Sequence, residues 1–440
     1  MSLTSPSLSS LSLPISPALS STLQSTAPLP LQISQRAARV EPFYVMEVGK
    51  AARALAAQAA GTDKPMVFVN IGEPDFSAPP LVQEAAERAI RAGHTGYTQA
   101  TGLQELRERI SAWYASRFGV QVTARRIVLT AGASAALQLA CLALIDAGDE
   151  ILMPDPSYPC NRQFVSAADG VATLVATTPA ERFQLTADKV LEAWGAETHN
   201  GDRVKTCGDV TVKTRGVLLA SPSNPTGTSI HPDELRRIHH IVSQRGGVTM
   251  IDEIYLGISY DDTYGQSALA IDDQIISINS FSKYFGMTGW RLGWLVVPDA
   301  LVSTIEMLAQ HLYICPSTVA QHAALACFEP ASLVEFERRR AEFKARRDYF
   351  IPALRNLGFE VPVEPDGAFY VYADCSKIQS KINTSGSWDF CFEMMRRAHV
   401  AITPGRDFGS DSTSHFVRFS TASSMQDLRT AIARMREVLG

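Results

Sequence analysis

Apolar positions along the chain follow two alternating patterns. In two segments they recur at spacings of three and four, which predicts amphipathic helices over residues 81–92 and 103–116. Elsewhere, short apolar runs end in polar residues, glycine or proline, as buried parallel strands do. These runs are 127–130, 150–154, 216–221, 248–252 and 275–280. Strands that alternate with helices predict an α/β fold, a three-layer αβα domain around a mostly parallel sheet. Ligands of such sheets bind at the carboxyl ends of the strands.

The pattern changes from about residue 330. A long charged helix is expected there, followed by the strand-like segments GAFYVYAD (367–374) and HFVRFSTA (415–422). These features predict a smaller α+β domain, which the N-terminal segment completes. The predicted boundaries are 72–311 for the large domain and 36–71 with 312–440 for the small one.

Two segments fall outside this regular pattern. Residues 1–35 are rich in Ser, Leu, Pro and Thr and contain no acidic residue, which predicts a disordered tail. Transit peptides have a similar composition, so organelle targeting stays an alternative, as does an upstream extension of an assigned start site. Residues 196–215 are polar and are interpreted as an irregular surface insertion before a core strand.

Composition and charge narrow the class of protein. The 440 residues have a formal net charge of −5 and no long basic run, unlike a nucleic-acid binder. No stretch approaches the ~20 uninterrupted apolar residues that cross a bilayer. The seven cysteines are scattered along the chain and form no C-x-x-C pair. This pattern indicates reduced thiols, as in proteins of the cytoplasm. We expect a cytoplasmic enzyme that binds no nucleic acid, membrane or metal.

Candidate chemistry lies at the ends of the predicted strands. Lys283 follows the strand 275–280 on a glycine-rich turn, and Arg291, suited to bidentate binding of a phosphate, comes eight residues later. Asp252 ends a buried apolar run, where an unpaired carboxylate costs several kcal/mol, so a cationic partner is expected. Tyr255 and Asn224, in SNPTG, lie at the same rim. Taken singly, these residues also fit a surface lysine, a helix N-cap and a turn.

Two further strand ends add weaker signals. Ala133 and Ser134 begin a helix directly after a strand, and free backbone N–H groups at a helix start bind anions. Tyr158, in PDPSYPC, follows another strand, where its ring is able to stack on a planar ligand or to be an ordinary loop tyrosine.

Together these segments resemble the class I/II aminotransferases of fold type I, which use pyridoxal 5'-phosphate (PLP). The resemblance covers about residues 36–440, and its Lys-containing segment is highly specific. The matching segments, in the family's order, are NIGEPDF, GYTQATGLQELR, SNPTG, IDEIY, SFSKYFGMTGWRLG, GAFY and VRFS.

The resemblance implies a role for each candidate. Lys283 would form the internal aldimine (Schiff base) and move the proton between substrate and cofactor in a ping-pong transamination between an L-amino acid and a 2-oxo acid. Asp252 would keep the pyridine nitrogen protonated, and Tyr158 would stack on the ring. Asn224 and Tyr255 would hydrogen-bond the phenolic oxygen.

The remaining implied roles concern the phosphate, the substrate and a second subunit. Arg418, in HFVRFS, would bind the substrate α-carboxylate, with Gly72 leaving room beside it. Tyr97 would reach the phosphate of a neighbouring subunit, so a homodimer is implied. The phosphate would be held by Arg291, Ser280, Ser282 and the amides of Ala133 and Ser134.

Alternatives remain open at this stage. A PLP-dependent C–S β-lyase on the same scaffold would share all the cofactor residues, and a non-catalytic effector-sensing domain is a remote alternative. The sequence shows no second arginine assignable to a distal carboxylate, and Phe43 and Tyr44 are candidates for lining a side-chain pocket or for plain packing. An apolar or broad range of amino acids is therefore favoured.

Overall fold

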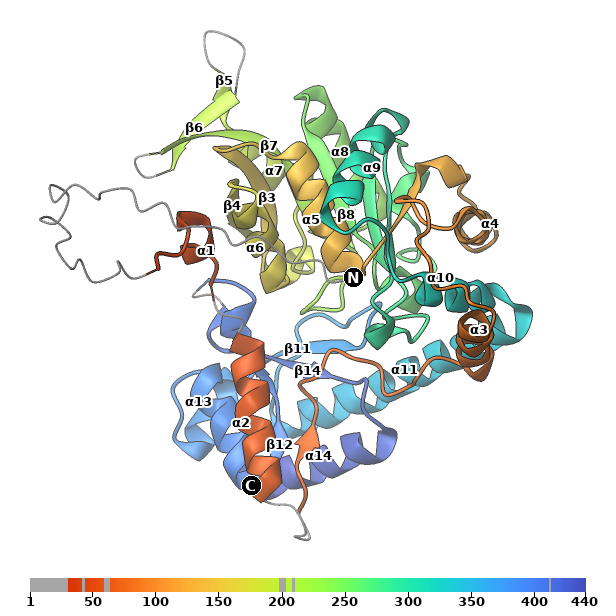
Figure 1. The fold of residues 1–440 in the computed structure, drawn as a ribbon. Coiled ribbons are helices and arrows are strands. Elements are labelled where there is room, and N and C mark those ends of the chain that lie inside the picture. The colour runs from red at the N-terminus through yellow and green to blue at the C-terminus, as the bar shows by residue number, and fades with distance from the viewer. Residues whose placement is uncertain (1–30, 42–43, 59–63, 198–202, 208–209, 411–412) are drawn as a thin grey trace, which may run out of the picture.

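The computed structural model describes residues 31–440 except 42–43, 59–63, 198–202, 208–209 and 411–412. A large sheet with helices on both faces occupies one end of the molecule, and a smaller α+β unit occupies the other (Figure 1). Most of the predicted disordered tail, residues 1–30, and Phe43 lie outside the described residues.

The central sheet of the described chain has nine strands. Along its main path the order is β2 (Ile127–Thr130), β10 (Gly293–Val296), β9 (Ile276–Ser280), β8 (Val248–Asp252), β7 (Val210–Ala220), β3 (Asp149–Asp155) and β4 (Val171–Ala176). The strands β9, β8, β7, β3 and β4 run parallel to one another, whereas β10 is antiparallel to both β2 and β9. The prediction of a mostly parallel sheet is confirmed.

Strand alternation divides the core between the two faces of the sheet. On β7, Leu218 packs with α5 (Ala133–Leu144) and α9 (Val302–Leu312), whereas Val217 and Leu219 pack with α7 (Ala187–Ala193) and α8 (Pro232–Gln244). Successive side chains of a strand point to opposite faces, so an uninterrupted apolar run serves both layers. The remaining helices of this part are α3 (Pro80–Arg91), α4 (Gln104–Phe118), α6 (Pro159–Ala167) and α10 (Thr318–Leu325).

The interpretation of residues 196–215 as irregular is wrong. β5 (Ala196–Glu197), β6 (Arg203–Cys207) and the first part of β7 form antiparallel pairs at the sheet margin, with Val204 opposite Lys213 and Cys207 opposite Val210. Apolar and polar residues alternate with period two in RVKTC and VTVKT, which is a strand signal. The high polar content of the segment obscures that period.

The smaller unit joins the two ends of the chain. Its three-stranded sheet has the order β11 (Tyr370–Asp374), β14 (Phe416–Ser420) and β13 (Thr403–Pro404). β1 (Val67–Phe68) pairs in parallel with β12 (Val400–Ala401). The helices are α2 (Tyr44–Gln58), α11 (Pro330–Leu357), α12 (Ser376–Gln379), α13 (Ser387–Glu393) and α14 (Met425–Leu439).

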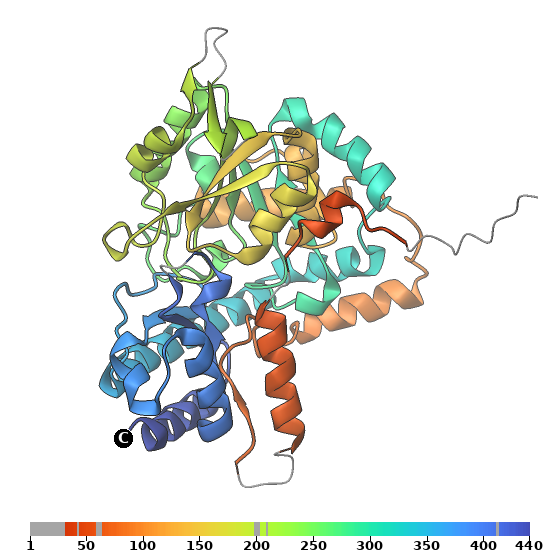
Figure 2. The ribbon, with the colours of Figure 1, turned by 90° about the vertical axis from the view of Figure 1, so that its left-hand side faces the viewer.

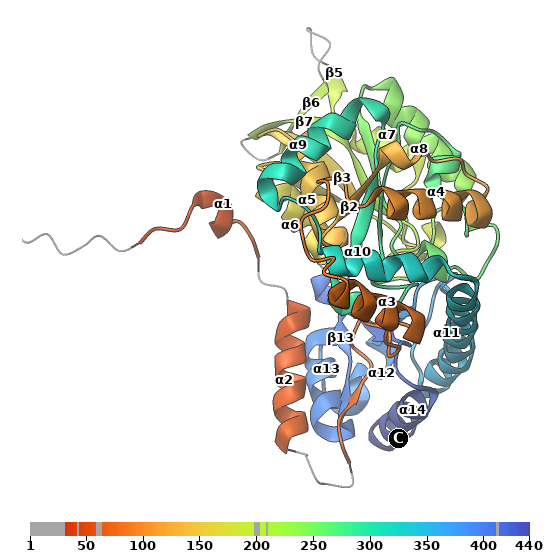
Figure 3. The ribbon, with the colours of Figure 1, turned by 45° about the vertical axis from the view of Figure 1, so that its right-hand side comes forward.

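Segments far apart in sequence meet in this unit. α2 lies beside α13 (Figure 3), and its Val48 and Ala52 pack with Met395 and Ala401. The short helix α1 (Gln35–Ala38) instead lies near α6 of the large unit (Figure 2), where Arg36 and the adjoining Arg39 pair with Asp169. The exact domain boundaries stay predictions. The predicted small domain includes α10, which lies beyond residue 312, but this helix packs against α3 and α4 of the large unit.

Candidate active site

Lys283 lies on the turn that follows β9, with its amine between the two units. Nζ donates a hydrogen bond to the carbonyl of Gly72 at 2.7 Å and lies 5.8 Å from the ring centre of Tyr255. Burial lowers the pKa of Lys283 to about 8; the charges of Glu73 and Asp252 oppose this lowering, and those of Arg418 and Arg291 add to it. Desolvation is the largest of these causes. The amine is therefore far more often neutral near pH 7 than an ordinary lysine.

Asp252 ends β8 and is 5% exposed. Its Oδ1 accepts the backbone N–H of Ile254 at 3.0 Å, as a turn-capping aspartate does. Burial raises the pKa of its carboxyl to about 7, while that hydrogen bond and the charge of Lys283 oppose the rise. No cationic side chain within the described ranges forms an ion pair with it. The carboxyl is thus both a local cap and a buried charge that a cationic ligand would stabilise.

Arg418 contacts residues of both units, and the pairing register of its strand sets its position. On β14 it lies opposite Tyr372 of β11 and Thr403 of β13. Its Nη1 donates to Oδ1 of Asn224 at 2.8 Å, and its Nη2 donates to the carbonyl of Asn70 at 2.7 Å. The side chain is only 3% exposed. Asn224, which follows β7, is therefore held by the small-domain arginine.

Gly72 lies near Arg418 and Lys283, and its lack of a side chain leaves space for a neighbouring ring. A Cβ at this position would overlap the hydroxyl of Tyr370, so only glycine fits without displacing that ring. The sequence expects Gly72 to leave room beside Arg418, and in the structure that room holds the Tyr370 hydroxyl. The Tyr370 ring centre lies 4.5 Å from the Arg418 guanidinium carbon.

A second group of candidates meets at the start of α5. Ser280 of β9 pairs with Gly293 of β10, and Gly293 pairs with Thr130 of β2, so the ends of three strands are adjacent. Ala133 and Ser134 begin α5 immediately after β2, and their N-terminal position leaves backbone N–H groups available.

Arg291 lies beside this helix start. Gly132, at φ +87°, allows the approach, because a Cβ there would lie 2.6 Å from Nη2 of Arg291. Ser280 donates from Oγ to Oγ of Ser282 at 2.9 Å. Two hydroxyls, a guanidinium and a helix N-terminus together favour a dianionic group such as a phosphate ester.

Three predicted aromatic residues differ in their placement. Tyr158 follows β3 and is partly buried, and burial raises the pKa of its phenol. Tyr97 is 80% exposed, and within the part of the chain that the structure describes no hydrogen bond, ion pair or ring contact joins it to Lys283, Asp252 or Arg418. Tyr44 begins α2 and packs edge-on against Trp388 at 6.0 Å, with the guanidinium of Arg406 at 4.8 Å. The packing interpretation fits Tyr44.

Sequence reasoning missed Tyr370. Its hydroxyl is 2.7 Å from that of Tyr255, and its ring is buried beneath Arg418. The segment GAFY marks the strand but gives the tyrosine no role by itself. The signal lies in pairing: residues 370 and 372 share a face of β11, and Arg418 is opposite residue 372, which sequence alone does not reveal.

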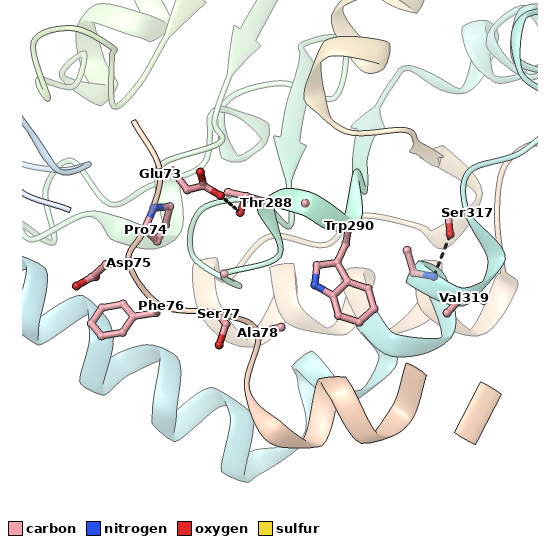
Figure 4. A pocket seen from close by; sticks show the side chains of 13 residues that line it. Glu73, Pro74, Asp75, Phe76, Ser77, Ala78, Thr288, Trp290, Ser317 and Val319 are labelled. Atoms are coloured by element: carbon pink, nitrogen blue, oxygen red, sulfur yellow. Dashed lines mark hydrogen bonds between the residues drawn. The ribbon is translucent and has the colours of Figure 1, made fainter. Parts of the chain in front are cut away.

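A hollow of about 620 Å³ is lined by Glu73, the neighbour of Gly72, and by Thr288, which lies between Lys283 and Arg291 in the chain. One wall is the segment from Glu73 to Ala78, and the other includes Trp290 and Val319 (Figure 4). Glu73 follows Gly72 and accepts a hydrogen bond from the hydroxyl of Thr288 (Figure 4). The described ranges contain no group of three or more His, Cys, Asp or Glu arranged to hold a metal ion. Nor does any helix there have the length and apolarity needed to cross a membrane.

Comparison with known proteins relates this geometry to an activity. Residues 64–435 match the family described as "Aminotransferase class I and II". The chain is 37% identical to the valine–pyruvate aminotransferase of Mycobacterium tuberculosis, over 90% of this chain and 96% of that protein. The crystal structure of an aminotransferase from the same organism superposes with a TM-score of 0.83 at 36% identity, covering 93% of this chain and 99% of that one. Aspartate aminotransferase from Thermus thermophilus with maleate gives 0.82 at 29% identity, covering 93% and 100%.

Proposed function

This chain belongs to the class I and II aminotransferases and catalyses transamination, and we propose that it does so with pyridoxal 5'-phosphate bound covalently to Lys283. The observation that carries the proposal is the buried Lys283 amine, whose pKa is lowered to about 8. A neutral amine attacks an aldehyde, whereas an ammonium does not.

The residues present fit the chemical groups of this cofactor. Its phosphate matches the N-terminus of α5 with Arg291, where a side chain on Gly132 would block the approach. Its protonated ring nitrogen matches Asp252, a buried carboxyl without a described cationic partner. Its phenolic oxygen matches the hydrogen-bonding groups of Tyr255 and Asn224. We assign Ser280, Ser282 and the amides of Ala133 and Ser134 to the phosphate, and Tyr158 to the ring face.

Each of three residues of this chain has a separate role in the proposed reaction. When bound, the cofactor accepts electron density from the substrate Cα into its protonated ring. Asp252 keeps that ring nitrogen charged, because ionisation of its buried carboxyl is favourable only beside a cation. Once the substrate amine has displaced it from the cofactor, the free Lys283 amine would take the proton from Cα and would hold it for transfer back. Arg418 orients the amino acid by binding its α-carboxylate, with Gly72 beside it.

A homodimer is part of the proposal. Tyr97 is 80% exposed, which is unusual for a large aromatic side chain, and a tyrosine from a second copy would supply a further donor to the phosphate. A cytoplasmic location also stays a prediction from the sequence.

The amino donor is proposed to carry an apolar side chain, with pyruvate among the acceptors. The relative named for valine and pyruvate supports this choice. Each of the twenty amino acids is tested by its ability to bleach the cofactor's visible band, with the released 2-oxo acid measured. The β-lyase alternative, which no observation favours, would instead give pyruvate, ammonia and a thiol while the band persists.

Purified protein is expected to absorb at about 410–430 nm, the range of a lysine-linked form of this cofactor. Borohydride reduction followed by peptide mass spectrometry should locate the label on Lys283. A label on any other lysine, or none in a protein supplied with the cofactor, contradicts the proposal.

Substitution of Arg418 is expected to act on substrate binding. In Arg418→Lys the bidentate contact to a carboxylate is lost, together with the Nη1 contact to Asn224. Losing a buried charged contact costs about 2–4 kcal/mol, so we expect KM for the amino acid to rise roughly 30-fold or more. Steady-state kinetics measure this change, and Arg429→Lys, at an exposed position of α14, is the control. An unchanged KM would refute the assigned role.

A further inference from the structure

Tyr370 connects three of the proposed functional groups although no role follows for it from the sequence. It is the first residue of β11 and is 2% exposed. Because Arg418 lies opposite Tyr372 in the antiparallel register, Tyr370 is its diagonal neighbour on the same face. The guanidinium carbon of Arg418 is 4.5 Å from the ring centre, within the range of a cation–π contact.

The hydroxyl of Tyr370 points toward the lysine side of the site. Its Oη is 2.7 Å from Oη of Tyr255, and it occupies the space beside Gly72. The carbonyl of Gly72 in turn accepts the hydrogen bond from Lys283. Any side chain on Gly72 would displace this hydroxyl, so the glycine and the phenol are matched in shape.

Either hydroxyl is able to donate in the hydrogen bond between the two phenols, and the role proposed for Tyr255 selects one direction. Burial raises the pKa of both hydroxyls, so each keeps its single proton. The titratable or charged groups that interact with Tyr370 are Tyr255, Asp252, Arg418 and Tyr158. If Tyr255 donates its proton to the cofactor's phenolic oxygen, Tyr370 has to be the donor to Tyr255. A donor of this kind polarises the second hydroxyl and strengthens its own hydrogen bond.

We propose that Tyr370 is a positioning residue with two separable actions: its hydroxyl directs the Tyr255 proton toward the cofactor, and its ring holds the Arg418 guanidinium for the substrate carboxylate. This inference rests on the proposed function. It predicts that the two actions respond to different substitutions at one position, since phenylalanine removes only the hydroxyl and leucine removes the ring as well.

The hydroxyl is tested by the pH titration of the visible band in the holoenzyme. A donor at the phenolic oxygen stabilises the anion there and so favours loss of the neighbouring nitrogen's proton. In Tyr370→Phe the titration midpoint should therefore rise by roughly 0.3 to 1 pH unit, the size of one modest hydrogen bond. Tyr255→Phe should raise it further, and the double variant should match Tyr255→Phe alone. Tyr349→Phe, a partly exposed tyrosine of α11, is the control.

The ring is tested by kinetics on the same variants. Tyr370→Phe should keep KM for the amino acid within about twofold, because phenylalanine preserves the cation–π face, whereas Tyr370→Leu should raise it roughly 3- to 30-fold. A folded Tyr370→Phe protein whose band titrates as in wild type would overturn the hydroxyl's role, and equal KM values for the Phe and Leu variants would overturn the ring's. Absence of the band from the wild-type protein would instead refute the proposed function.

Discussion

Replacing Lys283 with alanine is expected to lower kcat by roughly four to six orders of magnitude, because one side chain supplies both the covalent attachment and the proton transfer. The cofactor should still bind, since the proposed phosphate and ring contacts belong to other residues. Its spectrum should change to that of the free aldehyde. Stopped-flow and overnight assays on protein reconstituted with excess cofactor measure the loss.

Two comparisons make this result specific. Lys344→Ala removes an exposed lysine of α11 that pairs with Asp348, and it should leave kcat unchanged. Added primary amines should restore part of the Lys283→Ala activity if proton transfer is the missing step. A Lys283→Ala protein with at least one hundredth of the wild-type turnover would be inconsistent with the assigned role.

Asp252→Asn is expected to lower kcat by roughly two to four orders of magnitude while the fold is retained. Asparagine has the same shape and its Oδ1 still accepts the N–H of Ile254, so the turn after β8 should persist. It has no negative charge, and the ring nitrogen would lose the partner that keeps it protonated. Circular dichroism, cofactor content and single-turnover rates separate folding from chemistry.

The cofactor-free protein gives a second readout for Asp252. Its pKa is raised by burial to about 7, so the folded state holds a proton that the unfolded chain releases near pH 4. The stability that this group contributes is therefore present at acid pH and is lost as pH rises toward 7. Asp252→Asn should remove this part of the pH dependence, whereas Asp261→Asn, at an exposed position, should not. An identical profile in both variants would place Asp252 in a solvated environment.

The sequence predicted the individual strands better than it predicted which strands lie next to one another in the sheet. The apolar runs at 127–130 and 248–252 coincide with β2 and β8, because a strand buried on both faces is apolar throughout. The strand order and the antiparallel direction of β10 depend on long-range packing and have no local signal. The ribbon that includes β6 was missed because its alternation involves charged residues instead of a clear apolar run.

In the site as well, residues with a local sequence signal were predicted, whereas contacts that depend on long-range packing were not. Asp252 and Lys283 were identifiable because they end or directly follow a recognisable strand, and strand ends of one sheet converge. Arg291 was identifiable from its place on the glycine-rich segment after Lys283. The contact between Arg418 and Asn224 joins the two units and depends on how they pack. Tyr370 was missed for a related reason, since its importance arises from cross-strand register and from a glycine elsewhere in the chain.

The pairing of β1 with β12 also determines when the smaller unit is completed. Val67 is opposite Val400, so β1 is synthesised long before its partner strand. The large sheet, by contrast, draws all its strands from residues 127–296 and has its full set much sooner. Domains generally fold as units during synthesis, and β1 and α2 expose apolar surface in that interval. A chain truncated before residue 400 would therefore retain a sheet with Lys283 but lack both the partner of β1 and Arg418.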